Sequence, residues 1–141
     1  MEHRLECVGE RGGIRYYNDS IATNPESTLA ALDALKGPFV LIAGGFDKRL
    51  PFDRLGAEIA RRVRAAILIG QTAPQIAEAI RAGKGATEIV MAADLKSAVG
   101  AAKRIAREGD VVLLSPACAS FDMFRNFAER GRLFKEYLQW D

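Results

Sequence analysis

The chain has 141 residues, 49% hydrophobic and 27% charged, which is typical of one globular domain with a core of its own. Its formal charge of +2 comes from 20 basic and 18 acidic residues, and no basic run with aromatic neighbours favours a nucleic-acid partner. The apolar runs are too short for a membrane helix, and the polar start, Met1 to Glu6, does not resemble a signal peptide. We therefore expect a cytoplasmic protein with neither nucleic acid nor membrane as a partner.

The first elements in chain order form a predicted β-hairpin. Leu5–Glu10 and Ile14–Asn18 alternate polar and apolar residues around the turn Gly12-Gly13. A helix over Pro25–Leu35 follows, and either residue 23 or residue 24 can cap it, with a proline in its first turn.

From residue 39 onward, short apolar strands alternate with helices. The predicted strands are Phe39–Ala43, Ala66–Ile69, Glu88–Met91 and Val111–Leu114, and the predicted helices between them are Phe52–Arg64, Ala73–Ala82 and Leu95–Arg107. Almost wholly apolar strands fit a parallel sheet that is covered on both faces. The fold class is therefore α/β, a Rossmann-like three-layer sandwich with a mostly parallel sheet and an N-terminal β-hairpin, in a single domain over residues 1–141.

A last helix is predicted near the C-terminus. Asn126 can cap it, with Glu129 three residues later, so that Phe127 is its first residue and has a backbone N–H without an intrahelical partner. Gly131 lies on the buried stripe of this helix with Phe134. A glycine there costs about 1 kcal/mol relative to alanine unless close packing requires it.

The chain has two cysteines and one histidine, which limits the chemistry available to it. Cys7 and Cys118 do not make a disulfide framework, so a reduced environment is expected. No zinc site can be assembled from cysteine and histidine alone, and there is no Ser-His-Asp arrangement. Because His3 lies so near the N-terminus, we expect it at the surface.

Three loops with polar residues follow predicted strands, over residues 19–23, 44–48 and 115–127. The carboxyl ends of parallel strands meet at one edge of a sheet, which is where open α/β sheets bind ligands. The donors in these loops are the hydroxyls of Thr23 and Ser120, the ammonium of Lys48, and backbone N–H groups near Phe121 and Phe127. Such a set suits a small dianion.

Each of these residues also has an ordinary structural explanation. Thr23 can be a helix cap, Lys48 a solvated surface lysine, and Asp19 a residue that only holds its own turn. The remaining candidates have equally simple roles: Ser115 and Ser120 can satisfy loop backbone, Cys118 can be a packing residue, and Phe121, Phe124 and Phe127 can be core residues. The residues alone therefore predict an α/β domain with a candidate anion site.

In combination, these segments resemble the C-terminal domain of the Mur ligases, most closely the branch that joins glutamate to UDP-N-acetylmuramoyl-L-alanine. The matching segments are His3–Glu6, Asn18–Asn24 apart from Ile21, Gly44-Gly45 with Lys48, and Ser115–Ser120 continuing through Gly131. They follow the family order over nearly the whole chain. At Ile21 many glutamate-adding members have a lysine. The Asp-Asn-Pro-Arg motif of the diaminopimelate- and lysine-adding members is missing, which favours glutamate.

The resemblance implies a reaction and a set of binding residues. In this family ATP converts a carboxylate of the nucleotide substrate into an acyl phosphate, which the amine of the incoming amino acid attacks to form an amide. By resemblance, Thr23, Lys48 and Ser120 hold the glutamate carboxylates, helped by the backbone N–H groups of Phe121 and Phe127. In the same way, Arg4 and Asp19 match positions that contact the nucleotide. The domain then contributes positioning, with no catalytic group beyond that and no metal ligand.

The family's other parts are expected to lie outside this chain. There is no phosphate-binding loop of the type G-x-x-x-x-G-K-[ST], and the resemblance places ATP and Mg²⁺ mainly on a central ATPase domain. We therefore expect that the uridine-nucleotide and central domains are absent here, that this fragment alone holds no cofactor, and that it is inactive. Its expected partners are glutamate, UDP-N-acetylmuramoyl-L-alanine and the central domain.

Two other functions remain open at this point. The domain can belong to a folylpolyglutamate synthase or another amide ligase, or it can be a free-standing binding module. A Rossmann-like dehydrogenase is disfavoured because no G-x-G-x-x-G follows a strand.

Overall fold

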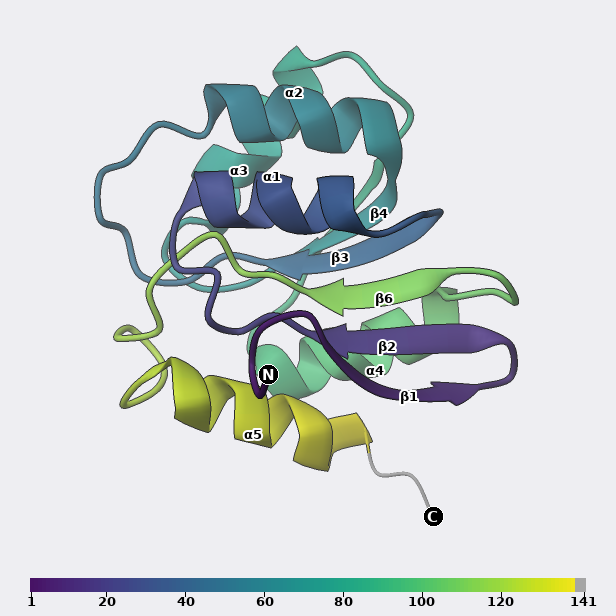
Figure 1. Ribbon diagram of the computed structural model, residues 1–141. Coiled ribbons are helices and arrows are strands. Elements are labelled where there is room, and N and C mark those ends of the chain that lie inside the picture. Colours follow the sequence, from purple (N-terminus) through teal and green to yellow (C-terminus); the bar gives the residue numbers. More distant parts are fainter. Residues whose placement is uncertain (139–141) are drawn as a thin grey trace.

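A computed structural model describes residues 1–138, which form a six-stranded sheet with helices on both faces (Figure 1). The strands are β1 (Glu6–Arg11), β2 (Ile14–Asn18), β3 (Phe39–Ala43), β4 (Val63–Leu68), β5 (Glu88–Met91) and β6 (Val111–Leu114). Their order in the sheet is β1-β2-β6-β3-β4-β5. The β1–β2 pair is antiparallel and every other pair is parallel, which confirms the predicted hairpin and mostly parallel sheet.

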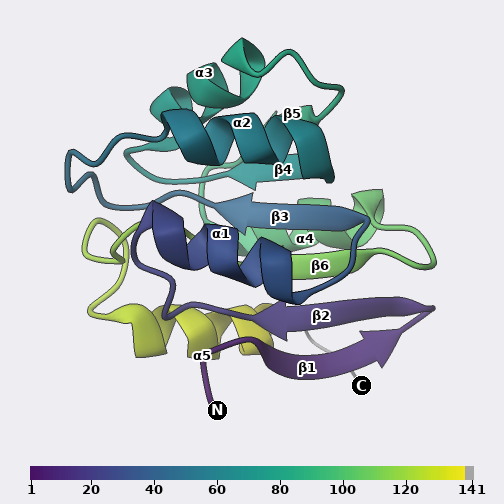
Figure 2. The same cartoon turned by 45° about the horizontal axis from the view of Figure 1, so that its top comes forward.

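The helices divide between the two faces of the sheet, as the views in Figures 1 and 2 show. One face carries α1 (Pro25–Ala34), α2 (Asp53–Arg62) and α3 (Ala73–Ala82), and the other carries α4 (Leu95–Ile105) and α5 (Phe127–Leu138). Strand β3 is buried throughout and contributes side chains to the apolar cores on both faces of the sheet. Leu41 packs with the first group of helices and Val40 with the second. The α/β three-layer prediction is confirmed.

Apart from β4, the predicted elements begin and end within two residues of the expected bounds. Strand β4 begins at Val63 rather than at Ala66, because α2 ends at Arg62 and Val63 already pairs with Phe39. Of the two candidate caps of α1, the structure selects Asn24, whose side chain accepts from the Ser27 backbone N–H at 2.9 Å.

The register of the sheet brings three strand ends together. Asn18 at the end of β2 pairs with Leu114 at the end of β6, which in turn pairs with Ile42 of β3. The segments that follow these strands, over residues 19–24, 115–126 and 44–52, therefore leave the sheet at the same edge. We call this the carboxyl edge, and the other end of the parallel strands the amino edge.

Within residues 1–138 no helix is long and apolar enough to span a membrane.

Candidate functional site

The five residues expected to hold glutamate line one pocket at the carboxyl edge. Its volume is about 180 Å³, and its lining is Thr23, Lys48, Ala119, Ser120, Phe121, Asn126 and Phe127. Pockets for drug-sized ligands have volumes of about 300–1,000 Å³, so this one suits a smaller molecule. We call it the amino-acid pocket.

Three polar side chains of the amino-acid pocket have no partner in the part of the chain that the structure describes. Thr23 and Lys48 make no hydrogen bond or ion pair there, and neither does the hydroxyl of Ser120, although Ser120 is only 2% exposed. Polar groups that are buried in a folded protein are normally paired. Donors that converge on a pocket without protein partners are therefore available to a ligand.

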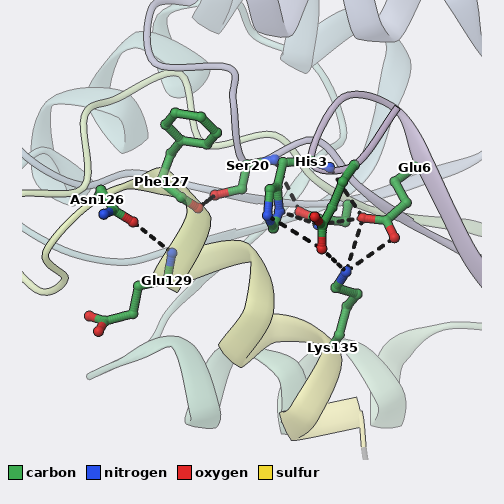
Figure 3. Close-up of polar contacts among 9 residues, drawn as sticks. His3, Glu6, Ser20, Asn126, Phe127, Glu129 and Lys135 are labelled. Carbon is green, nitrogen blue, oxygen red and sulfur yellow. Dashed lines mark hydrogen bonds and ion pairs between the residues drawn. The ribbon is translucent and has the colours of Figure 1, made fainter.

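The N-terminus of α5 adds backbone donors to the same pocket. Asn126 caps the helix as predicted, because its Oδ1 accepts from the Glu129 N–H at 2.8 Å (Figure 3). The Glu129 carboxylate accepts from the Arg125 N–H at 3.0 Å, and the hydrogen bonds from Arg125 lower the pKa of Glu129. The N–H of Phe127 has no acceptor within residues 1–138, so it and the positive end of the helix are open to an anion.

Lys48 is carried by a loop whose backbone is fixed by close contacts. Gly44 has φ +111°, and a Cβ there would lie 2.0 Å from the Ile69 carbonyl oxygen, so no larger residue fits without a shift. Phe46 donates its N–H to the Ala119 carbonyl at 2.8 Å, which ties this loop to the segment that carries Ser120. The loop therefore fixes the backbone of Lys48, while the Lys48 side chain stays exposed.

Behind the pocket lies a buried cation that the sequence analysis did not assign. Arg130 is 1% exposed, and it donates to Ser20 through Nε (Oγ, 3.0 Å) and Nη2 (backbone carbonyl, 2.8 Å). Burial lowers the pKa of Arg130 to about 10, so the guanidinium remains charged at pH 7. Its Nη1 is buried without an acceptor in the described residues. The sequence signal from which this burial could have been predicted is the position of the arginine, next to Gly131 on the apolar stripe of α5.

The two residues expected near the nucleotide line a second pocket at the same edge. Arg4 and Asp19 face a volume of about 300 Å³ together with Ile21 and the small residues of α1. Asp19 accepts from the Leu5 N–H at 3.0 Å and from the Ser115 hydroxyl at 2.8 Å, so it does more than hold its own turn. Burial raises the pKa of Asp19, although these hydrogen bonds and the charge of Arg4 oppose the shift.

The prediction that His3 lies at the surface is wrong. His3 is 8% exposed, its Nδ1 lies 2.9 Å from Asn18 Nδ2, and its ring meets the Phe127 ring edge-on at 5.9 Å. Helix α5 packs over the N-terminal segment, which position in the sequence does not reveal. A Cβ at Gly131 would lie 2.2 Å from His3 Nδ1, which confirms close packing as the reason for that glycine.

One group of side chains within residues 1–138 has the spacing of a metal site, and its carboxylates already pair with a lysine. Potential ligand atoms of Glu2, His3 and Glu6 lie within 4.8 Å of one another. Lys135 Nζ lies 3.0 Å from Glu2 and 3.1 Å from Glu6. The contact with Glu6 can be followed in Figure 3. Burial raises the pKa of Glu6, but hydrogen bonds from the His3 N–H, Asn18 and Lys135 outweigh it and lower the pKa overall. The ammonium thus occupies the place that a cation would take.

The structure also tests the ordinary structural roles considered for Phe121, Phe124 and Cys118. Phe121 is 67% exposed and meets Phe46 edge-on, so its assignment to the core is wrong, whereas Phe124 does pack against the core under α4 and α5. Cys118 is a packing residue in contact with Thr72 at 3.2 Å, and burial raises the pKa of its thiol to about 11.

Comparison with known proteins identifies the family of this chain. The family described as "Mur ligase, glutamate ligase domain" matches residues 3–118. UDP-N-acetylmuramoylalanine–D-glutamate ligase from Symbiobacterium thermophilum is 52% identical over 139 residues, and the enzyme of that name from Acetivibrio thermocellus is 51% identical over 142 residues. These matches cover 99% and 96% of this chain but 30% of each relative, so the chain spans less than a third of their length.

A solved structure shows the same fold at low identity. The murein peptide ligase of Psychrobacter arcticus superimposes with a TM-score of 0.64 and 16% identity, over 99% of this chain and 31% of its own. Since the family matches residues 3–118, most of the chain, the chain belongs to the Mur ligases, as their glutamate ligase domain.

Proposed function

We propose that this domain binds D-glutamate for a cytoplasmic ligase that joins it to UDP-N-acetylmuramoyl-L-alanine in peptidoglycan precursor synthesis. The observation that carries the proposal is the amino-acid pocket, where Thr23, Lys48 and Ser120 converge without protein partners in the described residues. The choice of D-glutamate and of the nucleotide substrate is supported by relatives at 51–52% identity whose names state them.

The chemistry of the pocket fits a dicarboxylate. Lys48 supplies a full positive charge, Thr23 and Ser120 supply hydroxyl donors, and Phe127 supplies the first N–H of a twelve-residue helix. Charge-assisted hydrogen bonds to carboxylates are about twice as strong as neutral ones, which offsets the cost of removing both carboxylates from water. Phe121 also lines the pocket and completes the predicted set.

The contribution of this domain to the reaction is positioning. The unprotonated amine of glutamate attacks the acyl carbon of the acyl phosphate, a C–N bond forms, the C–O bond to phosphate breaks, and phosphate leaves with the electron pair. The attacking nitrogen gives up one proton, to the departing phosphate or to water, as the amide forms. Fixing both carboxylates restricts where the amine lies, and such fixing can supply roughly 7–11 kcal/mol of a barrier. No side chain of this domain needs to take part in the bond changes.

The second pocket supports a contact with the nucleotide. Arg4 offers a guanidinium suited to phosphate and Asp19 a carboxylate suited to hydroxyl groups, and both line the pocket of about 300 Å³. ATP would reach them from a partner ATPase domain, which would also hold Mg²⁺ through its own ligands. That ion supplies charge neutralisation for phosphoryl transfer. The domain alone is then expected to be inactive.

The test is phosphate release by the full-length ligase that carries this domain, with ATP, Mg²⁺ and UDP-N-acetylmuramoyl-L-alanine. Release that requires D-glutamate and is not supported by L-glutamate is the expected result. Release with a folate and L-glutamate instead would reassign the domain to a folylpolyglutamate synthase. A gene that encodes no phosphate-binding loop beside this domain would make it a free-standing module.

A further inference from the structure

Ser20 connects the two segments that form the amino-acid pocket. Thr23 comes from the segment after β2, whereas Ser120 and Phe121 come from the segment between β6 and α5 and Phe127 is the first residue of α5. Within residues 1–138, every hydrogen bond that joins residues 19–24 to residues 120–130 involves Ser20. Beyond the Asp19–Ser115 hydrogen bond at the start of the two segments, their relative position at the pocket therefore depends on the contacts of Ser20 with Phe127 and Arg130.

The hydrogen bonds of Ser20 leave it no group free for a ligand. Its hydroxyl donates to the Phe127 carbonyl at 2.6 Å and accepts from Arg130 Nε at 3.0 Å (Figure 3 shows the first of these). Its carbonyl accepts from Arg130 Nη2, its N–H donates to Asn18 Oδ1 at 3.1 Å, and the residue is 0% exposed. Ser20 thus acts on the pocket only through the residues that it holds.

We propose that Ser20 is a positioning residue that sets the spacing of the amino-acid pocket and thereby its selectivity for the length of the amino acid. It holds Phe127, whose N–H is one of the pocket's donors, and it lies three residues before Thr23, which supplies another. This inference rests on the proposed function, because it assumes that the pocket holds glutamate.

The chemistry of the contact explains why a hydroxyl is needed. The Ser20 oxygen is both donor and acceptor, so it joins a carbonyl and a buried guanidinium that would otherwise lose a partner. Arg130 already has one nitrogen without an acceptor, so losing the Ser20 hydroxyl leaves a second one unpaired and allows α5 to shift.

The experiment compares Ser20→Ala and Ser20→Cys in the full-length ligase, with glutamate, aspartate and 2-aminoadipate as acceptors. For Ser20→Ala we expect the KM for glutamate to rise about tenfold, with kcat and the KM for ATP changed less than about threefold. The preference for glutamate over 2-aminoadipate, which is one methylene longer, should fall. Ser20→Cys keeps a weak donor and should lie between Ser20→Ala and the wild type.

Thr87→Ala is the matched control, because the Thr87 hydroxyl lies 3.0 and 2.7 Å from the Ile59 and Val63 carbonyls, far from the pocket. It should lower the thermal midpoint without changing any KM or the acceptor preference. If Ser20→Ala does not fold, Ser20→Cys carries the test. A folded Ser20 variant whose glutamate KM and acceptor preference equal those of the wild type would overturn the positioning role alone. A wild-type ligase without glutamate-dependent phosphate release would overturn the proposed function as well.

Discussion

At the amino edge of the sheet, the Thr87 hydroxyl lies within hydrogen-bond distance of two carbonyls, and Arg64 pairs with Asp110 and donates to the Ile105 carbonyl. At the carboxyl edge, Thr23 and Lys48 are the same kinds of residue, a threonine and a cation, and neither has a partner within residues 1–138. These amino-edge residues and these two pocket residues thus differ in whether they have protein partners, although they lie at the two ends of the same sheet.

Because of this difference, we expect some polar residues of the domain to contribute to its stability and others to its binding of a ligand. A paired polar group contributes to the free energy of unfolding, and removing its partner has a cost. A polar group without a protein partner contributes little to folding and can give its full interaction to a ligand. Substitutions of the paired amino-edge residues should therefore change stability, and substitutions of the unpaired pocket residues Thr23 and Lys48 should change glutamate binding.

The largest effect is expected at Lys48. Lys48→Gln should reduce kcat/KM for glutamate by roughly 10- to 100-fold, because a charge-assisted hydrogen bond worth about 1.5–3 kcal/mol is lost. The thermal midpoint should change by less than about 2 °C, since an exposed side chain without partners is replaced. Steady-state phosphate release and thermal unfolding measure the two quantities, with exposed Lys36→Gln as the matched control. A large loss of stability with normal kinetics would reverse the assignment of the two edges.

The next effect is expected at Asp110, and it should have the opposite character. Asp110 is 4% exposed, pairs with Arg64, and accepts from the Arg107 N–H at 2.8 Å. Asp110→Ala should lower the free energy of unfolding by about 2 kcal/mol, less than for a fully buried pair because the Arg64 side chain is 25% exposed. Urea unfolding measures this.

The control for Asp110 is Asp33→Ala, which removes a surface pair with Arg62 and should cost less than about 0.5 kcal/mol. Glutamate kinetics of the Asp110 variant should equal those of the wild type. A raised KM would show that the amino edge also shapes the pocket.

A smaller pair of effects is expected from one substitution made at both edges. Thr23→Val should raise the KM for glutamate about fivefold, and Thr87→Val should lower the free energy of unfolding by about 1 kcal/mol. Each variant should leave the other quantity unchanged. Because the two substitutions are chemically identical, equal effects of both on stability would remove the distinction between the edges.

The smallest effect concerns Cys118, which lies at the carboxyl edge but is paired with Thr72. Burial raises the pKa of its thiol from 9.0 to about 11. At pH 8 a thiol reagent should therefore modify exposed Cys7 only, one group per chain, and both groups after unfolding. Since the native thiol keeps its proton to higher pH than the unfolded one, the free energy of unfolding should fall as the pH rises from about 9 to 11. Rapid reaction of two groups at pH 8 would show that this part of the edge opens.

Much of this arrangement could be predicted from local sequence. Strands such as β3 and β6 are continuous apolar runs, and Asn126 with Glu129 marks the start of α5, so the free N–H of Phe127 could be predicted before its surroundings were known. The convergence of the three loops followed from parallel strands ending at one edge. The family resemblance then selected Thr23 and Lys48 from residues whose local patterns left other roles open.

The contacts that the sequence did not reveal connect residues far apart in the chain. Ser20 and Arg130 are 110 residues apart, and nothing in the residues around either one indicates that they meet. The burial of His3 likewise depends on where α5 lies, which is a property of the packed domain. Local patterns predict elements and their ends, whereas such pairings follow only from packing.

The most direct test of the amino-acid pocket is a titration of the ¹⁵N-labelled chain with D-glutamate, followed by amide chemical shifts. A titration with up to roughly 100 mM glutamate would detect binding that is much weaker than a Kd of about 1 mM. We predict shifts concentrated at Thr23, Ser120, Phe121 and Phe127 that are lost in Lys48→Gln. Shifts confined to another surface, or none over this range, would contradict the assignment of the pocket to glutamate.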